Sequence, residues 1–261
     1  MLGASAWAAT PSTKPNIVLM FIDDMGYGDI GPFGNTVNKT PNLDRMAEEG
    51  IKLTQFYVAN TACTPSRAAL LTGTYAHRIG MDGGNGNLVV TFLGDSRGLN
   101  PSEITIAEML RENGYATGCF GKWHLGDQPE FMPLNQGFDT YFGIPYSNDM
   151  WPQHTARNPI TKRKYEPLPV MKQDKAVAHV ADEFDQSLLA EVITDEAIAF
   201  IEKNQKRPFF CYIPHAHVHY PRHARPEYLE RAEGNVDRAH VEEVDDSIGR
   251  MREDLDPKIG I

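Results

Sequence analysis

A cysteine, a proline and an arginine lie close together in the pentapeptide Cys63-Thr64-Pro65-Ser66-Arg67, a spacing that suits chemistry on an anionic substrate. Pro65 has the fixed φ of a first helical residue, the run after it favours a helix, and Gly73 can end that helix. Cys63 is therefore predicted just before a helix N-terminus, where free backbone N–H groups favour anions. Arg67 adds a planar donor fork for oxyanions one turn later. The expected ligand is sulfate or phosphate.

Two adjacent carboxylates, Asp23 and Asp24, follow a short apolar run at 16–22 that predicts a buried strand. Neighbouring strand residues point to opposite faces, so both carboxylates reach one ion only if the chain turns there. Gly26 and Gly28 allow such a turn. Their hard oxygen atoms suit Ca²⁺, with Mg²⁺ as a second choice. The plain alternative is a solvated turn.

Lysine and histidine side chains form two further candidate groups. Lys122 and His124 are two residues apart, so an extended segment would point both to one face and let both reach one anion. His215, His217 and His219 alternate after a predicted strand. This alternation permits a zinc site, or a loop in which only one histidine acts.

Alternating strands and helices must position these side chains, and this order predicts a layered α/β sandwich. Strands are predicted over 16–22, 51–58, 115–120 and 208–213, and helices over 42–49, 105–113, 187–204 and 241–255, besides the helix after Cys63. Residues 150–182 are rich in Pro, Lys, Arg and polar residues with little periodicity. We expect an extended surface excursion there, the kind of loop that often carries substrate selectivity.

Composition excludes several classes of protein. The 261 residues, 41% of them hydrophobic, can bury one substantial core. The 35 acidic residues outnumber the 25 basic ones, giving a net charge of −10, which argues against a nucleic-acid partner. The sequence contains no run of eighteen apolar residues, so it predicts no membrane span. Cys119 and Cys211 lie in strand-like apolar runs and are expected to be buried small hydrophobes.

The first thirteen residues are set apart by small and apolar side chains. Ala6-Trp7-Ala8 fits an A-x-A cleavage site, although the basic n-region and most of the h-region of a signal peptide are missing. Residues 1–13 are therefore interpreted as a signal-peptide remnant or a disordered terminus. A periplasmic or secreted location is favoured, and a cytoplasmic one stays open.

Six ordered segments resemble the type I, formylglycine-dependent sulfatases, and their residues are most similar to those of the arylsulfatase A-like branch. The segments are 15–29, 40–44, 63–73, 121–126, 143–149 and 218–221. The resemblance as a whole spans roughly residues 14 to 255. One such motif alone would be a modest signal, whereas six in order make coincidence a poor explanation.

The resemblance implies an alkaline-phosphatase-like α/β fold with a mixed, mostly parallel sheet, and a sulfuric ester hydrolase acting on aryl or carbohydrate sulfate esters. It implies that a modifying enzyme converts Cys63 to formylglycine (3-oxoalanine), whose hydrate attacks sulfur. Asp23, Asp24 and residue 63 would hold the cation. Further site residues carried over are Arg67, Lys122 and His124 near the nucleophile, and Ser147 and His219 at the substrate.

One departure from the family pattern puts activity in doubt. Family members carry a further strand ending in Asp-Asn-Gly, which completes the metal site, and a further active-site lysine, and neither is found here. Residues 14–261 are therefore expected to be a truncated N-terminal catalytic domain and a poor sulfatase by themselves. One rival is an impaired fragment or paralogue that binds oxyanions. Another is a phosphatase or phosphodiesterase of the same superfamily, although these usually place Ser or Thr where Cys63 stands.

Overall fold

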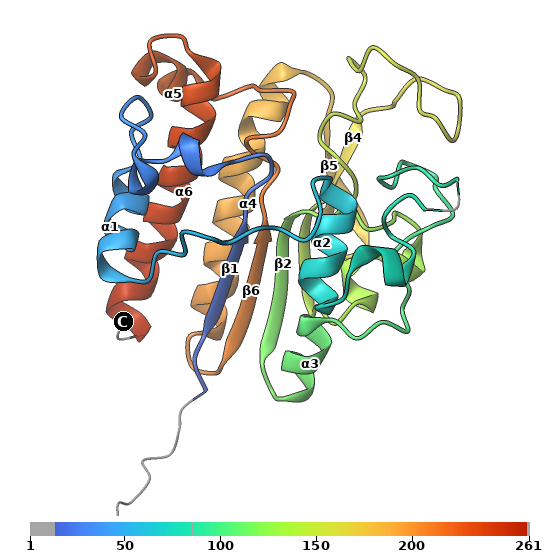
Figure 1. Cartoon of the computed structure of the whole chain (residues 1–261), viewed down its shortest axis with the longest axis horizontal. Helices are drawn as coiled ribbons and strands as arrows, with labels where there is room; N and C mark the ends of the chain where they lie inside the picture. The colour runs from blue at the N-terminus through green and yellow to red at the C-terminus, as the bar shows by residue number, and fades with distance from the viewer. Residues whose placement is uncertain (1–13, 85, 260–261) are drawn as a thin grey trace, which may run out of the picture.

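A six-stranded sheet forms the centre of the computed structural model, which describes residues 14–84 and 86–259, with side chains up to 253 (Figure 1). The strand order is β1-β6-β2-β3-β4-β5. The first four are parallel, and β4 and β5 continue the sheet antiparallel. The strands are β1 (Ile17–Phe21), β2 (Ala116–Lys122), β3 (Thr140–Ile144), β4 (Leu168–Lys172), β5 (Lys175–Val180) and β6 (Phe209–Pro214).

Helices cover both faces of this sheet, which confirms the α/β sandwich predicted from the alternating elements. Strand residues alternate between two apolar clusters because successive side chains point to opposite faces. In β6, Phe209 and Cys211 pack with α4, while Phe210 and Tyr212 pack with α2 and α3. The helices are α1 (Pro41–Glu49), α2 (Cys63–Thr72), α3 (Ile106–Glu112), α4 (Glu183–Asn204), α5 (Pro226–Arg231) and α6 (Val236–Ile259).

The helix after the pentapeptide begins earlier than predicted. Cys63 is itself the first residue of α2, with Ala62 as the cap, so Pro65 occupies the third helical position. A proline is tolerated there because the first turn of a helix has no intrahelical partner for its N–H groups. Gly73 ends the helix as expected, with φ of 64° and its N–H donated to the carbonyl of Ala69.

The predicted strand at 51–58 is wrong. These residues form turns and irregular chain, and the side chains of Ile51, Leu53 and Tyr57 are mostly exposed. The segment is held by the Tyr27 hydroxyl, which donates to the carbonyl of Phe56 at 2.7 Å. Alternating apolar residues make a strand only where a partner strand supplies hydrogen bonds, and no strand in the described ranges pairs with this segment.

The segment predicted as a surface excursion, residues 150–182, contains regular structure in its second half. Residues 168–180 form the hairpin β4–β5, which extends the sheet beyond β3. Its two-residue turn is Gln173-Asp174, with Gln173 at a φ of 58°. A hairpin turn of this kind usually carries Asn-Gly or Asp-Gly, so Gln173-Asp174 does not mark a turn in the sequence. No helix in the described residues is long and apolar enough to cross a bilayer.

Candidate active site

The candidate residues meet where the parallel strands end, beside the first turn of α2 (Figure 1). Asp23 follows β1, Lys122 ends β2, and His219 lies just beyond β6. Backbone hydrogen bonds join two of these ends, from the Asp23 N–H to the carbonyl of His217 at 3.0 Å and from the Val218 N–H to the carbonyl of Asp23 at 2.7 Å. Carboxyl ends of parallel strands are where α/β sheets bind ligands.

A buried charge triad lies at the centre of this region. The Lys122 ammonium donates to Asp23 Oδ2 at 2.5 Å, and Arg67 Nη2 lies 3.2 Å from the same oxygen. All three side chains are buried. Burial alone would raise the pKa of Asp23, but Lys122 and Arg67 outweigh it and hold that pKa well below its usual range. Two buried cations thus share one carboxylate, which leaves an excess positive charge facing the start of α2.

Arg67 is placed differently from the sequence expectation. Its Nη1 donates to the carbonyl of Lys122 at 2.7 Å, and its Nη2 lies 3.5 Å from the carbonyl of His215. Both Nη atoms are therefore occupied by the protein backbone and Asp23, while the buried Nε has no hydrogen-bond partner among the described residues. Arg67 fixes the ends of β2 and β6 relative to each other, and we assign it a positioning role.

Cys63 lies half-buried at the N-terminus of α2. Burial raises the pKa of its thiol above the ordinary value, and the opposing charges of Lys122 and Arg67 do not reverse that shift. An unmodified Cys63 is therefore mostly a neutral thiol at neutral pH and a weak nucleophile. Cys119 and Cys211 are fully buried in the sheet, which confirms their prediction as small hydrophobes.

His124 is held in one tautomer. Its Nε2 lies 2.9 Å from the carbonyl of Thr91, which can only accept, so Nε2 carries the proton and Nδ1 is an acceptor. Nδ1 is buried and has no hydrogen-bond partner among the described residues. Burial, together with the charges of Lys122 and Arg67, holds the pKa of His124 well below its ordinary value. The imidazole is therefore neutral with an unprotonated Nδ1, but it is a weaker base than an ordinary histidine.

Backbone geometry at His124 differs from the extended segment that the sequence suggested. β2 ends at Lys122, and His124 has a left-handed φ of 58°. Its carbonyl accepts hydrogen bonds from the hydroxyls of Thr64 at 2.9 Å and Thr91 at 3.3 Å. Both threonines were missed from the sequence, because nothing in their local context marks two hydroxyls that meet a carbonyl from distant segments.

Asp24 and His219 lie on the open side of the region. Asp24 has a left-handed φ of 60°, so the chain turns at this residue before Gly26 and Gly28. Its carboxylate is half-exposed, and Oδ2 lies 3.9 Å from His219 Nε2. His219 is more exposed than His217, with 20% of its side chain accessible against 5%.

Ser147 is buried in the chain segment that follows β3, and its hydroxyl has no hydrogen-bond partner among the described residues. The amide of the next residue, Asn148, lies 3.5 Å from the carbonyl of Tyr220, beside His219. The structure thus brings Ser147 to the same end of the sheet without giving it a polar contact. Its role stays a prediction.

The alternating histidines separate into two environments. His215 and His217 are buried and turn towards α6, where the His217 ring stacks on His240 at 4.0 Å and His217 Nε2 lies 3.3 Å from Glu243. Glu243 also accepts from Arg225 at 3.0 Å. His219 points instead to the open side, so the three do not form a zinc site. Sequence analysis did not identify His240 and Glu243, which lie 23 and 26 residues after His217.

This buried histidine cluster predicts acid sensitivity. Burial lowers the pKa of both His215 and His217 to about 3, so below pH 6.5 the unfolded chain binds protons that the folded chain does not. Stability should therefore fall as pH drops, by up to about 1.4 kcal/mol per pH unit for each histidine. Glu243, whose pKa burial raises, acts with the opposite sign. Urea unfolding at pH 7 and pH 5 measures the slope.

The matched variants His217→Phe and His179→Phe separate this cause from a general effect of acid. His179 is exposed on β5, so its replacement should leave the slope unchanged, whereas His217→Phe should make it shallower. Equal slopes in the two variants would contradict the assignment.

The site fits a hard cation in the type of its ligands but not in their number. Asp23 and Asp24 supply carboxylate oxygens, but Asp23 is already paired with Lys122 and Arg67. Within the described ranges no group of three His, Cys, Asp or Glu side chains is placed to hold a metal ion. Ca²⁺ usually takes six to eight oxygen ligands. The remaining ligands would have to come from water or from protein outside these residues.

Comparison with known proteins gives a consistent result. A model of the family described as Sulfatase matches residues 15–258. Human arylsulfatase A is 37% identical over 262 residues, covering 96% of this chain and 50% of that protein. The N-acetylgalactosamine-6-sulfatase of Sus scrofa is 36% identical over 262 residues, covering 96% and 49%. The chain thus spans about half the length of these curated relatives.

A solved structure shows the same fold. The crystal structure of Ps i-CgsB in complex with k-i-k-neocarrahexaose superposes with a TM-score of 0.80 at 30% sequence identity, covering 94% of this chain and 56% of that one. Both the sequence and the spatial arrangement of the described strands and helices therefore match proteins of one kind.

Proposed function

Since this chain belongs to the sulfatase family, we propose that it provides most of the catalytic centre of a hydrolase that cleaves aryl or carbohydrate sulfate esters. The observation that carries the proposal is the excess positive charge of Lys122 and Arg67 over Asp23 beside Cys63 at the N-terminus of α2. A sulfate monoester is anionic, and both the helix terminus and the ammonium of Lys122 favour it there.

We assign the chemical roles by position. Lys122 neutralises charge on the sulfate oxygens, and His219, on the open side, donates a proton to the departing oxygen. Neutral His124 accepts a proton through Nδ1 from a hydroxyl at residue 63, and the negative charge of a bound sulfate ester would offset the lowering of its pKa. This division follows general acid–base logic, in which each group needs the protonation state that its task requires.

Formylglycine derived from Cys63 would supply a hydrated aldehyde as nucleophile, which a neutral thiol in this site does not. In a host with the modifying enzyme, the peptide containing residue 63 should be about 18 Da lighter than its cysteine form. Mass spectrometry of a digest measures this directly. A fully alkylatable thiol at residue 63 in protein from the native organism would refute the modification, and the peptide containing Cys119 serves as the unmodified control.

Asp23 and Asp24 are the residues that would contact a divalent cation, Ca²⁺ in preference to Mg²⁺. Such an ion would act as a Lewis acid on the sulfate. A hard cation would also compete with Lys122 for Asp23, so metal binding and the Asp23–Lys122 contact should exclude each other in part.

Two rival functions remain testable. A phosphatase or phosphodiesterase would prefer aryl phosphate over aryl sulfate, and an impaired oxyanion-binding protein would bind sulfate without turnover. Hydrolysis of paired aryl sulfate and aryl phosphate, beside a sulfate-binding titration, separates all three. Export to a periplasm or the cell exterior is proposed from residues 6–8, which lie outside the described residues.

A further inference from the structure

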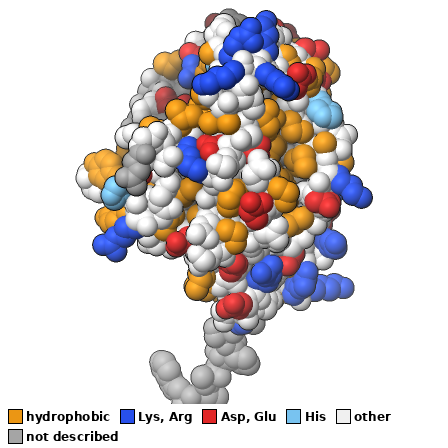
Figure 2. Space-filling model, turned by 90° about the vertical axis from the view of Figure 1, so that its right-hand side faces the viewer, with side chains coloured by type: hydrophobic (Ala, Val, Ile, Leu, Met, Phe, Trp, Pro, Cys, Tyr) orange, Lys and Arg blue, Asp and Glu red, His pale blue; other side chains and the backbone are white. Residues whose placement is uncertain are grey.

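A compact basic loop at residues 157–164 follows β3, at the end of the sheet where the site residues meet (Figure 1). Seen from its right-hand side, the molecule gathers Lys and Arg side chains at the top of that face (Figure 2). The basic residues of the loop are Arg157, Lys162, Arg163 and Lys164, and all are exposed. None of them forms an ion pair with a carboxylate in the described part of the chain.

This loop is held in place rather than free. Asn158 is buried, its amide donates to the carbonyl of Leu93 at 2.8 Å, and its side-chain oxygen accepts from the Ile160 N–H at 2.7 Å. Its N–H donates to the carbonyl of Arg163 at 2.9 Å, which closes the loop. The segment that receives it is the one whose Thr91 contacts His124. The backbone that carries these charges is therefore held beside the chain segment that supports the site.

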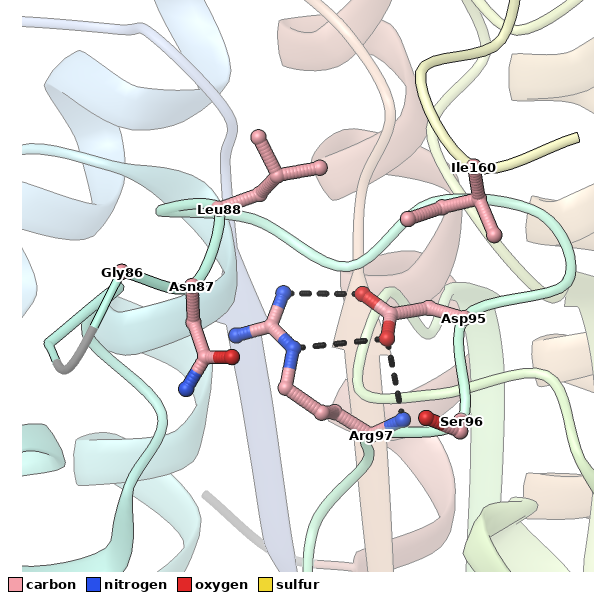
Figure 3. Close-up of a pocket in the computed structure, with 7 residues that line it drawn as sticks. All are labelled: Gly86, Asn87, Leu88, Asp95, Ser96, Arg97 and Ile160. Atoms are coloured by element: carbon pink, nitrogen blue, oxygen red, sulfur yellow. Dashed lines mark hydrogen bonds and ion pairs between the residues drawn. The ribbon is translucent and has the colours of Figure 1, made fainter. Parts of the chain in front are cut away.

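A pocket of about 210 Å³ lies between the loop and this segment (Figure 3). Leu88 and Ile160 line one side of it, and the polar side chains of Asn87 and Arg97 lie opposite. Asp95 holds Arg97 by two hydrogen bonds, at 2.8 and 3.3 Å, so the guanidinium is fixed in orientation. This volume leaves room for a ligand about the size of one sugar ring. Mixed apolar and hydrogen-bonding walls suit a carbohydrate.

We propose that the basic loop and this pocket form a secondary site for a sulfated glycan, which holds sugar residues next to the one whose ester is cleaved. The charge argument is specific, because the chain as a whole carries −10 yet presents four unpaired cations here. A repeating polyanion gains from such a patch, whereas a small aryl sulfate is too short to span it and the site. This inference rests on the proposed function and names its substrate class.

The test compares two charge-reversed double variants of equal charge change. Arg163→Glu/Lys164→Glu alters the loop, and Lys203→Glu/Lys206→Glu alters exposed lysines at the end of α4, beside the opposite ends of the strands. Calorimetry measures binding of a sulfated hexasaccharide and of its desulfated form. Only the loop variant should weaken sulfated-glycan binding, on the order of 10-fold at low ionic strength. The loss should shrink in high salt, where the Debye length falls to roughly 3 Å.

Turnover measurements distinguish the glycan site from the proposed hydrolase function. Aryl-sulfate hydrolysis should be the same in both double variants. Three results would contradict the secondary site. The two double variants could bind the sulfated glycan equally well, or the protein could bind the desulfated hexasaccharide as tightly as the sulfated one. A single-stranded oligonucleotide could also bind as tightly as the sulfated glycan. If the protein hydrolyses no sulfate ester while glycan binding still depends on Arg163 and Lys164, the proposed hydrolase function is wrong and the glycan site is still supported.

Discussion

Asp23→Ala should destabilise the protein by about 3–5 kcal/mol, because it leaves two buried cations without their shared carboxylate. Lys122 and Arg67 are almost completely buried, and Asp23 is the acidic group that neutralises them. Chemical denaturation with a fixed-slope analysis measures the loss.

The neighbouring residue provides a matched control for this prediction. Asp24→Ala removes a half-exposed carboxylate 3.9 Å from His219 and should cost less than about 1 kcal/mol. Asp23→Asn keeps the shape and removes the charge, so it should be nearly as damaging as Asp23→Ala. If Asp23→Asn were as stable as the unaltered chain, the triad would not contribute through its charge.

The same triad makes the stability of the protein depend on pH. Because the folded pKa of Asp23 lies below the unfolded value of 3.8, its contribution to stability is complete above that value. It is lost as pH falls through the folded pKa. This loss begins near pH 3.8, whereas the histidine effect begins near pH 6.5, so an acid titration should show the histidine effect first.

His124→Asn should lower turnover by about 10²–10⁴-fold, since an amide cannot take up a proton as the buried imidazole Nδ1 can. Asparagine is chosen because it tolerates the left-handed backbone found at this position, where φ is 58°. Any loss then reports the missing imidazole rather than a strained turn. Steady-state kinetics should show the change in kcat rather than in KM.

A comparison with His179→Asn controls for the loss of any histidine. His179 is exposed on β5, away from the site, and its replacement should leave kcat unchanged. Circular dichroism and thermal unfolding check that His124→Asn remains folded. A wild-type kcat in that variant would remove His124 from the mechanism.

Local sequence determined those features that depend on neighbouring residues. The apolar run before Asp23 predicted β1 within one residue at each end. Thr105 and Glu108 form a reciprocal cap that starts α3 where the sequence placed a helix. Gly73 ends α2 because only glycine adopts its left-handed φ without steric cost. Six ordered motifs also determined the family, which the matches to sulfatases confirm.

Tertiary structure alone decided how the charged and polar side chains combine. Lys122 lies 99 residues from Asp23, and their contact exists because β2 and β1 both border β6. The sheet also sends His217 to α6 while His219 stays on the open side, a separation that alternation along the chain does not predict. The segment 51–58 has strand-like residues but no partner strand, and Gln173-Asp174 makes a hairpin turn without glycine. Strand pairing and buried charge pairing both depend on distant segments, so their outcome follows from the assembled fold and not from local sequence.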